Sequence, residues 1–515
     1  MLKLNWQRTL TLFLPLVIWF IQKWLSRHST HELVNDTAAG VKAQHRLGSP
    51  DSLRIVDGNP DTTAVILNWS RFPNVQRIAV LLCSSSLEKI ILEVVVWNNS
   101  PQAISYEDFI DTTCPRSKLK IYNSPANLCF QARFLACAQS SSPYCFIQDD
   151  DYLVVPEVIQ SLHARIRQTQ HPHTIHLLPA HEYLTSTLRQ TFVHNEMSSK
   201  KSIHTGFAWL GHGTVMHRSE AMDFLKLMHQ LNASEEEMKM ADNYYSILSN
   251  RVPEIWFDQG VELGGGQPFT VGTEGDERNN RHILQATKYL ESIIFSDPPP
   301  AESGLLESLP FVRISEDYNL QTALSVRAAC RDARCLLESN IPLLPESLRH
   351  SVNSGADMLE LEAYNRGLVS SATNRNYLER PPSRAIDNRL DTLFESLGDA
   401  KIGEFIQLDY FDDLLVLHPS GGLEMVWLVD INTERILRSS QITTSSAGLT
   451  RCARASQVVC KDAQIAGESL RECIAPLQSS DLPHCELGHV ARLEVVRSVQ
   501  PPVPWRVHEV WVRGL

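Results

Sequence analysis

The feature that most constrains the fold is an alternation of short apolar runs and helical stretches between residues 62 and 151. Helical stretches are predicted at 75–83 and 127–139. The apolar runs are each closed by polar residues and lie at 63–67, 89–97, 119–122 and 144–147. Strands that alternate with helices form βαβ units, and buried parallel strands are continuous apolar runs. The pattern therefore predicts an α/β domain with a mostly parallel sheet.

Three consecutive carboxylates, Asp149, Asp150 and Asp151, follow the last of these predicted strands. In open α/β sheets, ligands bind at the carboxyl ends of the strands. Carboxylates in that position suit a hard divalent cation that also bridges substrate phosphates. Such a cation would neutralise the charge of a departing nucleotide diphosphate. The alternative interpretation is a solvated acidic turn.

Other polar residues occupy comparable positions. Asn98 and Asn99 end the second strand, where amides can bind a ribose or a uracil edge, or simply form a turn. Asn127 and Arg133 lie on the helix predicted before the acidic strand, and Arg133 is either a pyrophosphate ligand or a surface residue. Asp242 opens an apolar helix, as an N-cap or as the carboxylate that positions or deprotonates an acceptor hydroxyl.

Four segments, in this order and at this spacing, resemble the C-terminal transferase domain of the exostosins, glycosyltransferase family 64. They are 63–67 (TAVIL), 94–99 (VVVWNN), 127–134 and 146–151 (FIQDDD). Residues 206–224 and 240–248 resemble later parts of the same domain, so the resemblance covers about 62 to 295. It implies a GT-A fold, a UDP-sugar as donor, Mn²⁺ as cofactor, and retention of anomeric configuration.

The resemblance also implies roles for individual residues. The nucleotide site would be lined by Asn98 and Asn99, with Asn127 and Arg133 nearby. The acidic triplet 149–151 would contact the metal and the donor sugar, with Asp151 as direct metal ligand and Asp149 and Asp150 beside it. Asp242 would be the catalytic carboxylate.

Two positions depart from the family pattern. Ala241 stands where the family has a second acidic residue before the catalytic carboxylate. An alignment through His282 places Ala286 where the family has a late arginine, with Arg278 and Arg281 as possible substitutes. These departures bear on activity and on the acceptor more than on donor binding.

The second half of the chain differs in pattern. Residues 304–370 are expected to be helical, and the chain is strand-rich from about residue 371. That alternation predicts a separate antiparallel β-sandwich. Its segments 382–387, 391–392, 403–409 and 507–511 resemble discoidin-type (coagulation-factor C-type) domains, which often bind sugars or membranes.

The first residues predict a membrane anchor. Lys3 and Arg8 precede an apolar run from Leu10 to Ile21, typical of a signal-type segment, with no small-residue cleavage site close behind. We expect an uncleaved anchor, a type II orientation, and a luminal catalytic portion in the Golgi or the endoplasmic reticulum. A cleaved signal peptide and a buried helix are the alternatives. The predicted organisation is anchor 1–27, stem 28–61, GT-A domain 62–297, helical linker 298–370 and β-sandwich 371–515.

Cysteines, sequons and charge are consistent with a secretory-pathway protein. There are 11 cysteines, none in paired C-x-x-C spacing, and the last four allow three disulfide connectivities. Sequons occur at Asn35, Asn68, Asn98 and Asn232. The net charge of −12 excludes general affinity for phosphate backbones, so no nucleic-acid partner is expected.

Two further motifs are assigned no chemistry. Four histidines between 171 and 181 alternate along a predicted strand and its loop, so most cannot face one metal ion. The run Gly264, Gly265 and 266 lacks the lysine of a phosphate-binding loop and is expected to be a flexible loop near the mouth of the site.

Three functions remain open at this stage. The first is a UDP-sugar-dependent glycosyltransferase acting on a glycan or glycoprotein acceptor. The second is a non-catalytic carbohydrate-binding protein with a degenerate transferase domain, motivated by Ala241 and the missing arginine. The third is metal-dependent phosphoryl transfer, which shares the acidic triplet but lacks a phosphate loop. Slow hydrolysis of a UDP-sugar without acceptor separates the first two, and competition by nucleoside triphosphates separates the third.

Overall fold

The computed structural model describes most of one compact unit, residues 48–515. The described residues are 59–168, 173–194, 202–258, 260–265, 272–295, 310–314, 325–411, 423–445, 452–455, 458–465, 467–477 and 488–514. The predicted anchor and the predicted stem up to residue 58 lie outside these ranges. Within them, no helix is long and apolar enough to cross a membrane.

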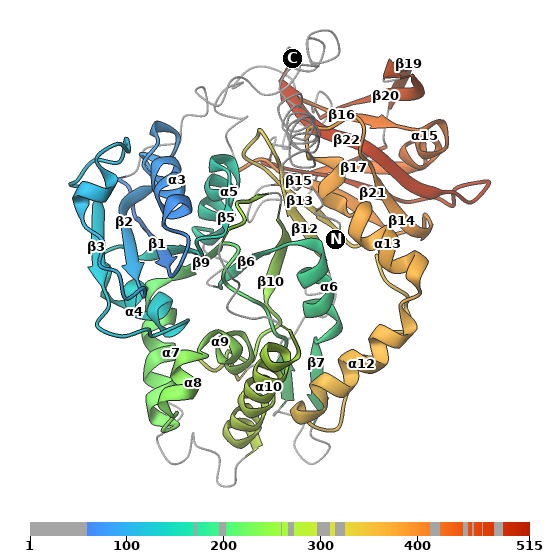
Figure 1. Ribbon diagram of the computed structural model, residues 1–515. Helices are drawn as coiled ribbons and strands as arrows, with labels where there is room; N and C mark the ends of the chain where they lie inside the picture. Colours follow the sequence, from blue (N-terminus) through green and yellow to red (C-terminus); the bar gives the residue numbers. More distant parts are fainter. Residues whose placement is uncertain are drawn as a thin grey trace, which may run out of the picture. The chain divides into compact units, whose positions relative to one another are not determined.

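The predicted parallel strands form the first part of a 13-stranded sheet (Figure 1). Strands β1 (Thr62–Asn68), β2 (Ile91–Asn98), β3 (Leu119–Asn123) and β4 (Tyr144–Gln148) pair in parallel, in the order β4-β1-β2-β3. Helix α3 (Phe72–Leu82) begins three residues earlier than expected, with a proline in its first turn, where the missing N–H costs nothing. The α/β prediction for this region is confirmed.

Helix α4 (Gln131–Gln139) begins later than predicted. Cys129 has a φ of +47°, a left-handed conformation that no helix interior accommodates. Asn127 therefore lies in the loop before α4, whereas Arg133 lies on the helix. The prediction that both residues share one helix was wrong for Asn127.

The sheet continues with strands of mixed direction. Strand β9 (Thr214–His217) runs antiparallel between β4 and β6 (Ile175–Leu178), and β10 (Glu254–Phe257) and β12 (Val326–Ala329) follow in parallel. Two short antiparallel pairs lie outside the large sheet: β5 (Tyr152–Leu153) with β11 (Val261–Glu262), and β7 (Thr191–His194) with β8 (Ser202–Thr205). The helices of this part are α5 (Pro156–Ile166), α6 (Ala180–Leu188), α7 (Arg218–Gln230), α8 (Glu235–Lys239), α9 (Asp242–Leu248) and α10 (Gly272–Phe295).

Both faces of the sheet are covered. Along β1, Ala64 and Ile66 belong to one apolar cluster, and Val65 and Leu67 belong to another. Successive side chains of a strand point to opposite faces, so the continuous apolar run of β1 supplies both cores. The carboxyl edge of the sheet is thereby left as the place where polar side chains gather.

Residues 304–370 correct a prediction, because they contain β12 and β13 (Leu336–Ser339) as well as the helix α12 (Met358–Leu368). Leu336 and Leu337, adjacent in sequence, are each 1% exposed because β13 is an interior strand covered on both faces. Adjacent buried leucines fit a helix or an interior strand equally well from sequence. The expectation of a helical region therefore holds for α12 and fails for β12 and β13.

The C-terminal strands divide between two sheets. Strands β15 (Phe405–Asp409), β21 (Val490–Val495), β17 (Ser440–Ser445) and β18 (Cys452–Ala455) extend the large sheet from β13 in antiparallel pairs. A separate five-stranded antiparallel sheet has the order β14 (Phe394–Asp399), β22 (Pro504–Gly514), β16 (Leu423–Val429), β20 (Glu468–Pro476) and β19 (Val459–Ile465). Helices α13 (Ser371–Glu379) and α15 (Ile431–Arg438) complete this part. Antiparallel structure is confirmed here, but the four strands that extend the large sheet are continuous with the α/β part.

The described cysteines form four disulfides and leave Cys129 as a free thiol. The disulfides are Cys83–Cys114, Cys137–Cys145, Cys330–Cys335 and Cys460–Cys473. Cys485 and the side chain of Cys452 lie outside the described residues, as does Asn35.

Two of the sequons cannot serve as glycan acceptors in the folded chain. Asn68 is 2% exposed and Asn98 fully buried, and the Asn68 amide donates to the Asn98 side-chain oxygen at 2.7 Å. Asn232, after α7, is exposed. It is the accessible sequon among the residues that the structure describes.

Candidate functional site

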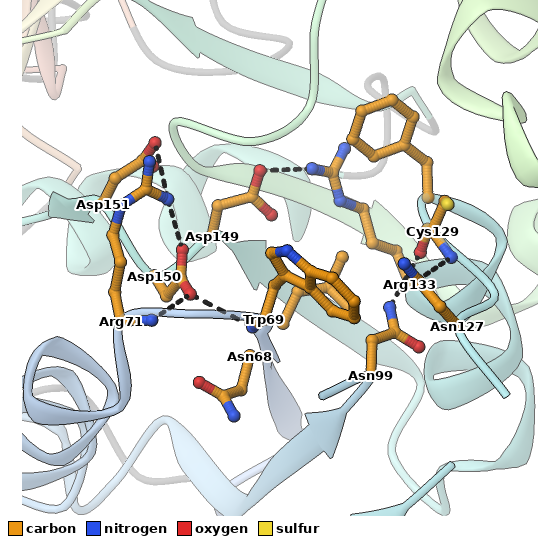
Figure 2. Close-up of a pocket in the computed structure, with 12 residues that line it drawn as sticks. Asn68, Trp69, Arg71, Asn99, Asn127, Cys129, Arg133, Asp149, Asp150 and Asp151 are labelled. Carbon is orange, nitrogen blue, oxygen red and sulfur yellow. Dashed lines mark hydrogen bonds and ion pairs between the residues drawn. The ribbon is translucent and has the colours of Figure 1, made fainter. Parts of the chain in front are cut away.

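Two adjoining cavities open at the carboxyl ends of β1, β2 and β4. The smaller, of about 110 Å³, is lined by residues at or just after the ends of these strands, by the loop before α4 and by Arg133 on α4 (Figure 2). Its lining residues are Leu67, Asn68, Trp69, Arg71, Asn99, Asn127, Cys129, Phe130, Arg133, Asp149, Asp150 and Asp151. The site thus forms where open α/β sheets bind their ligands.

The larger cavity, of about 800 Å³, shares Phe130, Arg133, Asp149 and Asp151 with the smaller one. Its other walls come from α6, α9, α10 and α12 and from the 209–212 segment. They are lined by Glu182, Thr185, Arg189, Trp209, Gly211, His212, Asp242, Asp276, Asn279, Asn280, Leu359, Glu362, Ala363 and Arg366. The shared residues therefore separate a small compartment from a large one.

Arg133 joins two of the predicted carboxylates. Its side chain is 1% exposed, and its two terminal nitrogens donate to Oδ2 of Asp149 and to Oδ2 of Asp242. The guanidinium also lies over the Phe130 ring, 4.8 Å from its centroid. Because a planar guanidinium donates in fixed directions, Arg133 fixes both carboxylates, which are distant in sequence, at the boundary of the cavities.

The carboxylate of Asp149 lies against a glycine. The backbone N–H of Asp149 donates to the carbonyl of Gly211 at 2.8 Å, and a Cβ at position 211 would overlap Oδ2 of Asp149. Burial raises the pKa of Asp149 to about 6; Arg133 opposes this rise, and the charges of Asp151 and Asp150 add to it. Its Oδ1 is buried and has no hydrogen-bond partner among the residues that the structure describes. One oxygen of Asp149 is thus held by Arg133, and the other is left for a ligand.

Asp150 accepts hydrogen bonds from the loop that follows β1. It is 4% exposed; its Oδ2 accepts from the backbone N–H groups of Trp69 and Arg71 at 3.2 and 3.3 Å, and its Oδ1 accepts from Arg71 Nη1 at 2.8 Å. Both oxygens are therefore occupied within the chain. The structure places Asp150 as a residue that shapes the cavity, whereas donor contact was predicted.

Asp151 lies beside Arg71 (Figure 2), with 44% of its side chain exposed. Its Oδ2 lies 3.4 Å from Arg71 Nη1. Together with the unpartnered Oδ1 of Asp149, it supplies hard oxygen donors of the kind that a divalent cation takes alongside substrate phosphates. These two residues fit the predicted Mn²⁺ site.

The three carboxylates do not form a cage by themselves. In the described ranges, the group of three or more metal-binding side chains that converge within 4.8 Å is Glu434, Cys460 and Cys473, whose cysteines form a disulfide. Of the histidines considered as metal ligands, His176 is buried in β6, and its Nδ1 contacts the Trp209 carbonyl oxygen at 2.9 Å. His171 lies outside the described residues.

The two predicted asparagines behave differently. Asn98 is fully buried; its amide donates to the Gln102 carbonyl and to the Asn123 side chain, both at 2.8 Å, and its Oδ1 accepts from Asn68. It ties the ends of β1, β2 and β3 together and does not line either cavity, contrary to the prediction. Asn99 lines the small cavity and bonds to the backbone of 128–129.

Asn127 lines the small cavity too, and its Oδ1 accepts the Cys129 N–H at 2.9 Å. Cys129 itself is half-buried, and burial raises its pKa while the charges of Lys239 and Arg278 lower it. Arg278 is therefore close to this side of the site. Arg281, the other candidate for the missing arginine, is 66% exposed and pairs with Glu236 at 3.0 Å.

The two departures from the family pattern are buried. Ala241, the N-cap residue of α9, and Ala286 are both fully buried in one apolar cluster. A carboxylate or guanidinium at either position would lie in the apolar core, where an unpaired charge is costly. Asp242 is the first residue of α9 and does not cap the helix. The Asp242 carboxylate instead pairs with Arg133 and lines the large cavity.

The 260–265 loop is fastened to the small cavity. Asn74 donates to the Gly264 carbonyl at 2.9 Å, and Arg71 Nε donates to the Gly265 carbonyl. Both glycines have positive φ, +62° and +78°, which other residues adopt at a cost. The loop lies beside the site, as predicted. Its described part is held by the side chains of Arg71 and Asn74, whereas a flexible loop was expected.

Sequence reasoning missed several lining residues. Trp69 and Arg71 follow β1 as Asn98 and Asn99 follow β2, and the strand-end rule would have indicated them. His212 carries an ion pair with Glu182, Nε2 to Oε2, at 3.1 Å, and no local pattern predicts this contact between residues 30 positions apart. The α12 residues lie outside the segment that resembles the transferase.

No family model and no curated protein matches the chain. Solved structures match about half of it. Glucosyl-3-phosphoglycerate synthase from Mycobacterium tuberculosis, in complex with Mn²⁺, UDP and phosphoglyceric acid, is 12% identical over 48% of this chain and 84% of that chain, with a TM-score of 0.31. The mannosyltransferase PcManGT from Pyrobaculum calidifontis, in complex with GDP-Man and Mn²⁺, is 13% identical over 54% of this chain and 75% of that chain, with a TM-score of 0.30. TarS residues 1–349 from S. aureus, in complex with UDP, are 12% identical over 47% of this chain and 74% of that chain, with a TM-score of 0.28.

These comparisons name neither glycosyltransferase family 64 nor a discoidin-type domain. TM-scores near 0.3 do not carry a functional assignment. What the chain itself defines is a mixed, mostly parallel α/β sheet with a polar site at its carboxyl edge, and a separate five-stranded antiparallel sheet.

Proposed function

We propose that the chain is a metal-dependent glycosyltransferase of GT-A type. It would move a sugar, with retention of configuration, from a UDP-sugar to a hydroxyl of a glycan or glycoprotein. The observation that carries this proposal is the ion-pair bridge Asp149–Arg133–Asp242 at the boundary of the two cavities, in which Arg133 and Asp242 are buried. It holds a donor-side carboxylate and an acceptor-side carboxylate at one guanidinium, as transfer between two substrates requires.

The small cavity suits the nucleotide. Asn99 and Asn127 offer amides, and Trp69, 45% exposed, offers an aromatic face to a base. Asp151, with Oδ1 of Asp149, would hold Mn²⁺ at the diphosphate. When bound, the cation would neutralise negative charge on the diphosphate as it leaves.

The large cavity suits the acceptor. In the transfer, the bond between the sugar C1 and the diphosphate oxygen breaks, and its electron pair stays on that oxygen. C1 bonds to the acceptor oxygen, and the proton of the acceptor hydroxyl passes to the departing diphosphate oxygen. Asp242 lines this cavity, and its Oδ1 is buried without a hydrogen-bond partner in the described part of the chain. That oxygen would accept a hydrogen bond from the acceptor hydroxyl and orient it.

The cellular setting of the proposal is a Golgi or endoplasmic reticulum membrane, with the N-terminal segment as a type II anchor. Four disulfides support an oxidising compartment, because such bonds are rare in reducing ones. The exposed sequon at Asn232 is compatible with a luminal location. Glycosidase-sensitive mass at Asn232 would test this, and its absence from protein of a secretory cell would count against the location.

The test of the function is calorimetric binding of UDP to residues 48–515, with and without Mn²⁺. Mn²⁺-dependent binding that is lost in Asp151→Ala and kept in Asp111→Ala, a control at an exposed carboxylate that lines neither cavity, supports a nucleotide-sugar site. Screening of UDP-sugars and acceptors for turnover then follows. If UDP binds under neither condition, the proposal fails.

The second candidate is a carbohydrate-binding protein that has lost turnover. It is favoured by the buried Ala286, because no arginine occupies that position. Hydrolysis of a UDP-sugar without acceptor, abolished by Asp242→Asn, would support the enzyme. UDP binding with no hydrolysis or transfer of any UDP-sugar would support the binding protein.

A further inference from the structure

Each arginine that lines the two cavities forms an ion pair with a carboxylate of the chain. Arg71 bonds to Asp150 and Arg133 to Asp149 and Asp242. On the far wall, Arg189 and Arg366 both pair with Glu362, at 2.5 and 2.6 Å. A substrate diphosphate that entered the site would have to compete with these internal partners.

His212 is a fifth cationic group on these walls, and it keeps one donor position open. Its Nε2 lies 3.1 Å from Glu182 Oε2 on α6, and its ring meets the Tyr152 ring edge-on at 4.9 Å between centroids. Its Nδ1 is buried and has no hydrogen-bond partner among the described residues. A buried N–H without a partner is costly, so this position is one that a ligand oxygen would stabilise.

The backbone places His212 beside the predicted metal-binding carboxylates. It directly follows Gly211, whose carbonyl accepts the Asp149 N–H at 2.8 Å and which leaves no room for a side chain against Asp149. His212 lines the large cavity together with Asp149 and Asp151. It therefore lies on the side of these carboxylates where the bond between sugar and diphosphate would break.

The surroundings of His212 favour its charged form. Burial alone would lower its pKa, but the hydrogen bond and the charge of Glu182, with the charges of Asp258 and Asp151, raise the pKa to about 9. The other titratable group packed against the ring, Tyr152, has a raised pKa and is neutral at pH 7. An imidazolium carries a hydrogen on both nitrogens, so Nδ1 is a charge-assisted donor.

We propose that His212 is a donor-binding residue whose Nδ1–H bonds to a diphosphate oxygen of the UDP-sugar. This inference rests on the proposed function and gives the site the cation that it lacks at Ala286. As the bond from C1 to the diphosphate oxygen breaks, the electron pair stays on oxygen, and the hydrogen bond from His212 stabilises that charge. His212 transfers no proton, because the imidazole remains protonated and bonded to Glu182.

The experiment compares UDP with UMP, which lacks the outer phosphate, by calorimetry on residues 48–515 in Mn²⁺. The variant is His212→Gln, and the matched control is His181→Gln, an exposed histidine on α6. We expect His212→Gln to weaken UDP about tenfold and UMP less than about twofold, because one charge-assisted bond to the outer phosphate is lost. His181→Gln should match the wild type with both ligands.

The possible failures are distinguishable. If the wild type binds UDP and His212→Gln binds it equally well, the role of His212 is overturned and the proposed function stands. Equal weakening of UDP and UMP also overturns it, because His212 would then support the fold of the site and not the diphosphate. If the wild type does not bind UDP, the proposed function fails, and this inference fails with it.

A second variant covers the case in which His212→Gln does not fold. Glu182→Gln keeps the imidazole but removes its charged partner. We expect it to weaken UDP binding while leaving UMP binding unchanged, and unchanged UDP binding in a folded Glu182→Gln variant would overturn the role of the pair. Thermal unfolding of each variant reports whether it folds.

Discussion

Gly211 is the residue where the geometry of the site is most sensitive to one added methyl group. A Cβ there would overlap Oδ2 of Asp149 and lie 3.2 Å from Arg133 Nη2. Gly211→Ala should therefore displace the Asp149 carboxylate and reduce Mn²⁺-dependent UDP affinity at least about tenfold, at a cost in stability of about 1–3 kcal/mol. Calorimetry and urea unfolding measure the two effects.

The control is Gly398→Ala in β14, where an added Cβ meets no atom within 4 Å. It should leave UDP binding unchanged. Wild-type UDP affinity in Gly211→Ala would show that Asp149 either moves freely or does not contribute to the site.

His176 gives the fold a dependence on acid pH. Burial in β6 lowers the pKa of His176 to about 4, against the hydrogen bond to the Trp209 carbonyl, whereas an unfolded histidine titrates near 6.5. Because the folded-state pKa is the lower one, the stabilisation is complete above pH 6.5 and is lost as pH falls toward 4. Between pH 7 and pH 5 the loss from this residue is about 2 kcal/mol.

Urea unfolding of wild type and His176→Asn at pH 7 and pH 5 isolates this contribution, because other histidines titrate in both proteins. The wild type should lose about 2 kcal/mol more than the variant over that interval. An equal loss in both would mean that His176 is not held neutral in the folded state.

At the scale of elements, Asn74 on α3 connects three segments. Its amide donates to the carbonyls of Asp150 and Gly264, both at 2.9 Å, and it is 7% exposed. Asn74→Ala removes both bonds and takes the partner from the buried carbonyl of Asp150, whereas the carbonyl of the exposed Gly264 can turn to water. The substitution should therefore cost about 1–3 kcal/mol and loosen the 260–265 loop. Limited proteolysis would detect cleavage at this loop.

Gln76 is the matched control on the same helix. It is an amide that donates to the Asp108 carbonyl at 2.5 Å from an exposed position. Gln76→Ala should change stability by less than about 1 kcal/mol and leave the loop resistant to protease. Equal protease resistance of Asn74→Ala would show that Arg71 suffices to hold the loop.

The elements also show what sequence could predict. β1, β2 and β4 are mostly buried on both faces, so their continuous apolar runs identified them and placed Asp149 to Asp151 at the carboxyl edge. α4 was extended too far because nothing local indicates the left-handed Cys129. The Arg133–Asp242 contact joins residues 109 positions apart, and His212–Glu182 depends on how α6 packs. Such contacts follow from tertiary structure, so sequence named part of the site, such as Asp149, Asp151 and Asp242, without the partners of these residues.

At the scale of the whole molecule, the α/β part and the C-terminal strands share one sheet. β13 pairs with β12 on one side and with β15 on the other, from Ser339–Ile406 to Leu336–Asp409. Side-chain ion pairs also join neighbouring strands. Arg327 on β12 pairs with Glu338 on β13 at 3.2 Å, and Asp409 on β15 pairs with His489, next to β21, at 2.8 Å. The predicted boundary at residue 371 is thus crossed by backbone hydrogen bonds.

We therefore expect residues 48–515 to unfold in one cooperative transition, although the sequence pattern predicts separate domains. A chain truncated after residue 370 would lose β15 and expose the edge of β13, with Leu336 and Leu337 uncovered. An exposed apolar edge strand promotes association, so the truncated chain should aggregate or fail to fold. Removal of residues 1–47, which lie outside the described residues, is the control and should leave the transition intact. Scanning calorimetry distinguishes the cases, because two separate transitions, or a soluble truncated chain that still binds UDP in Mn²⁺, would show that the transferase part folds without the C-terminal strands.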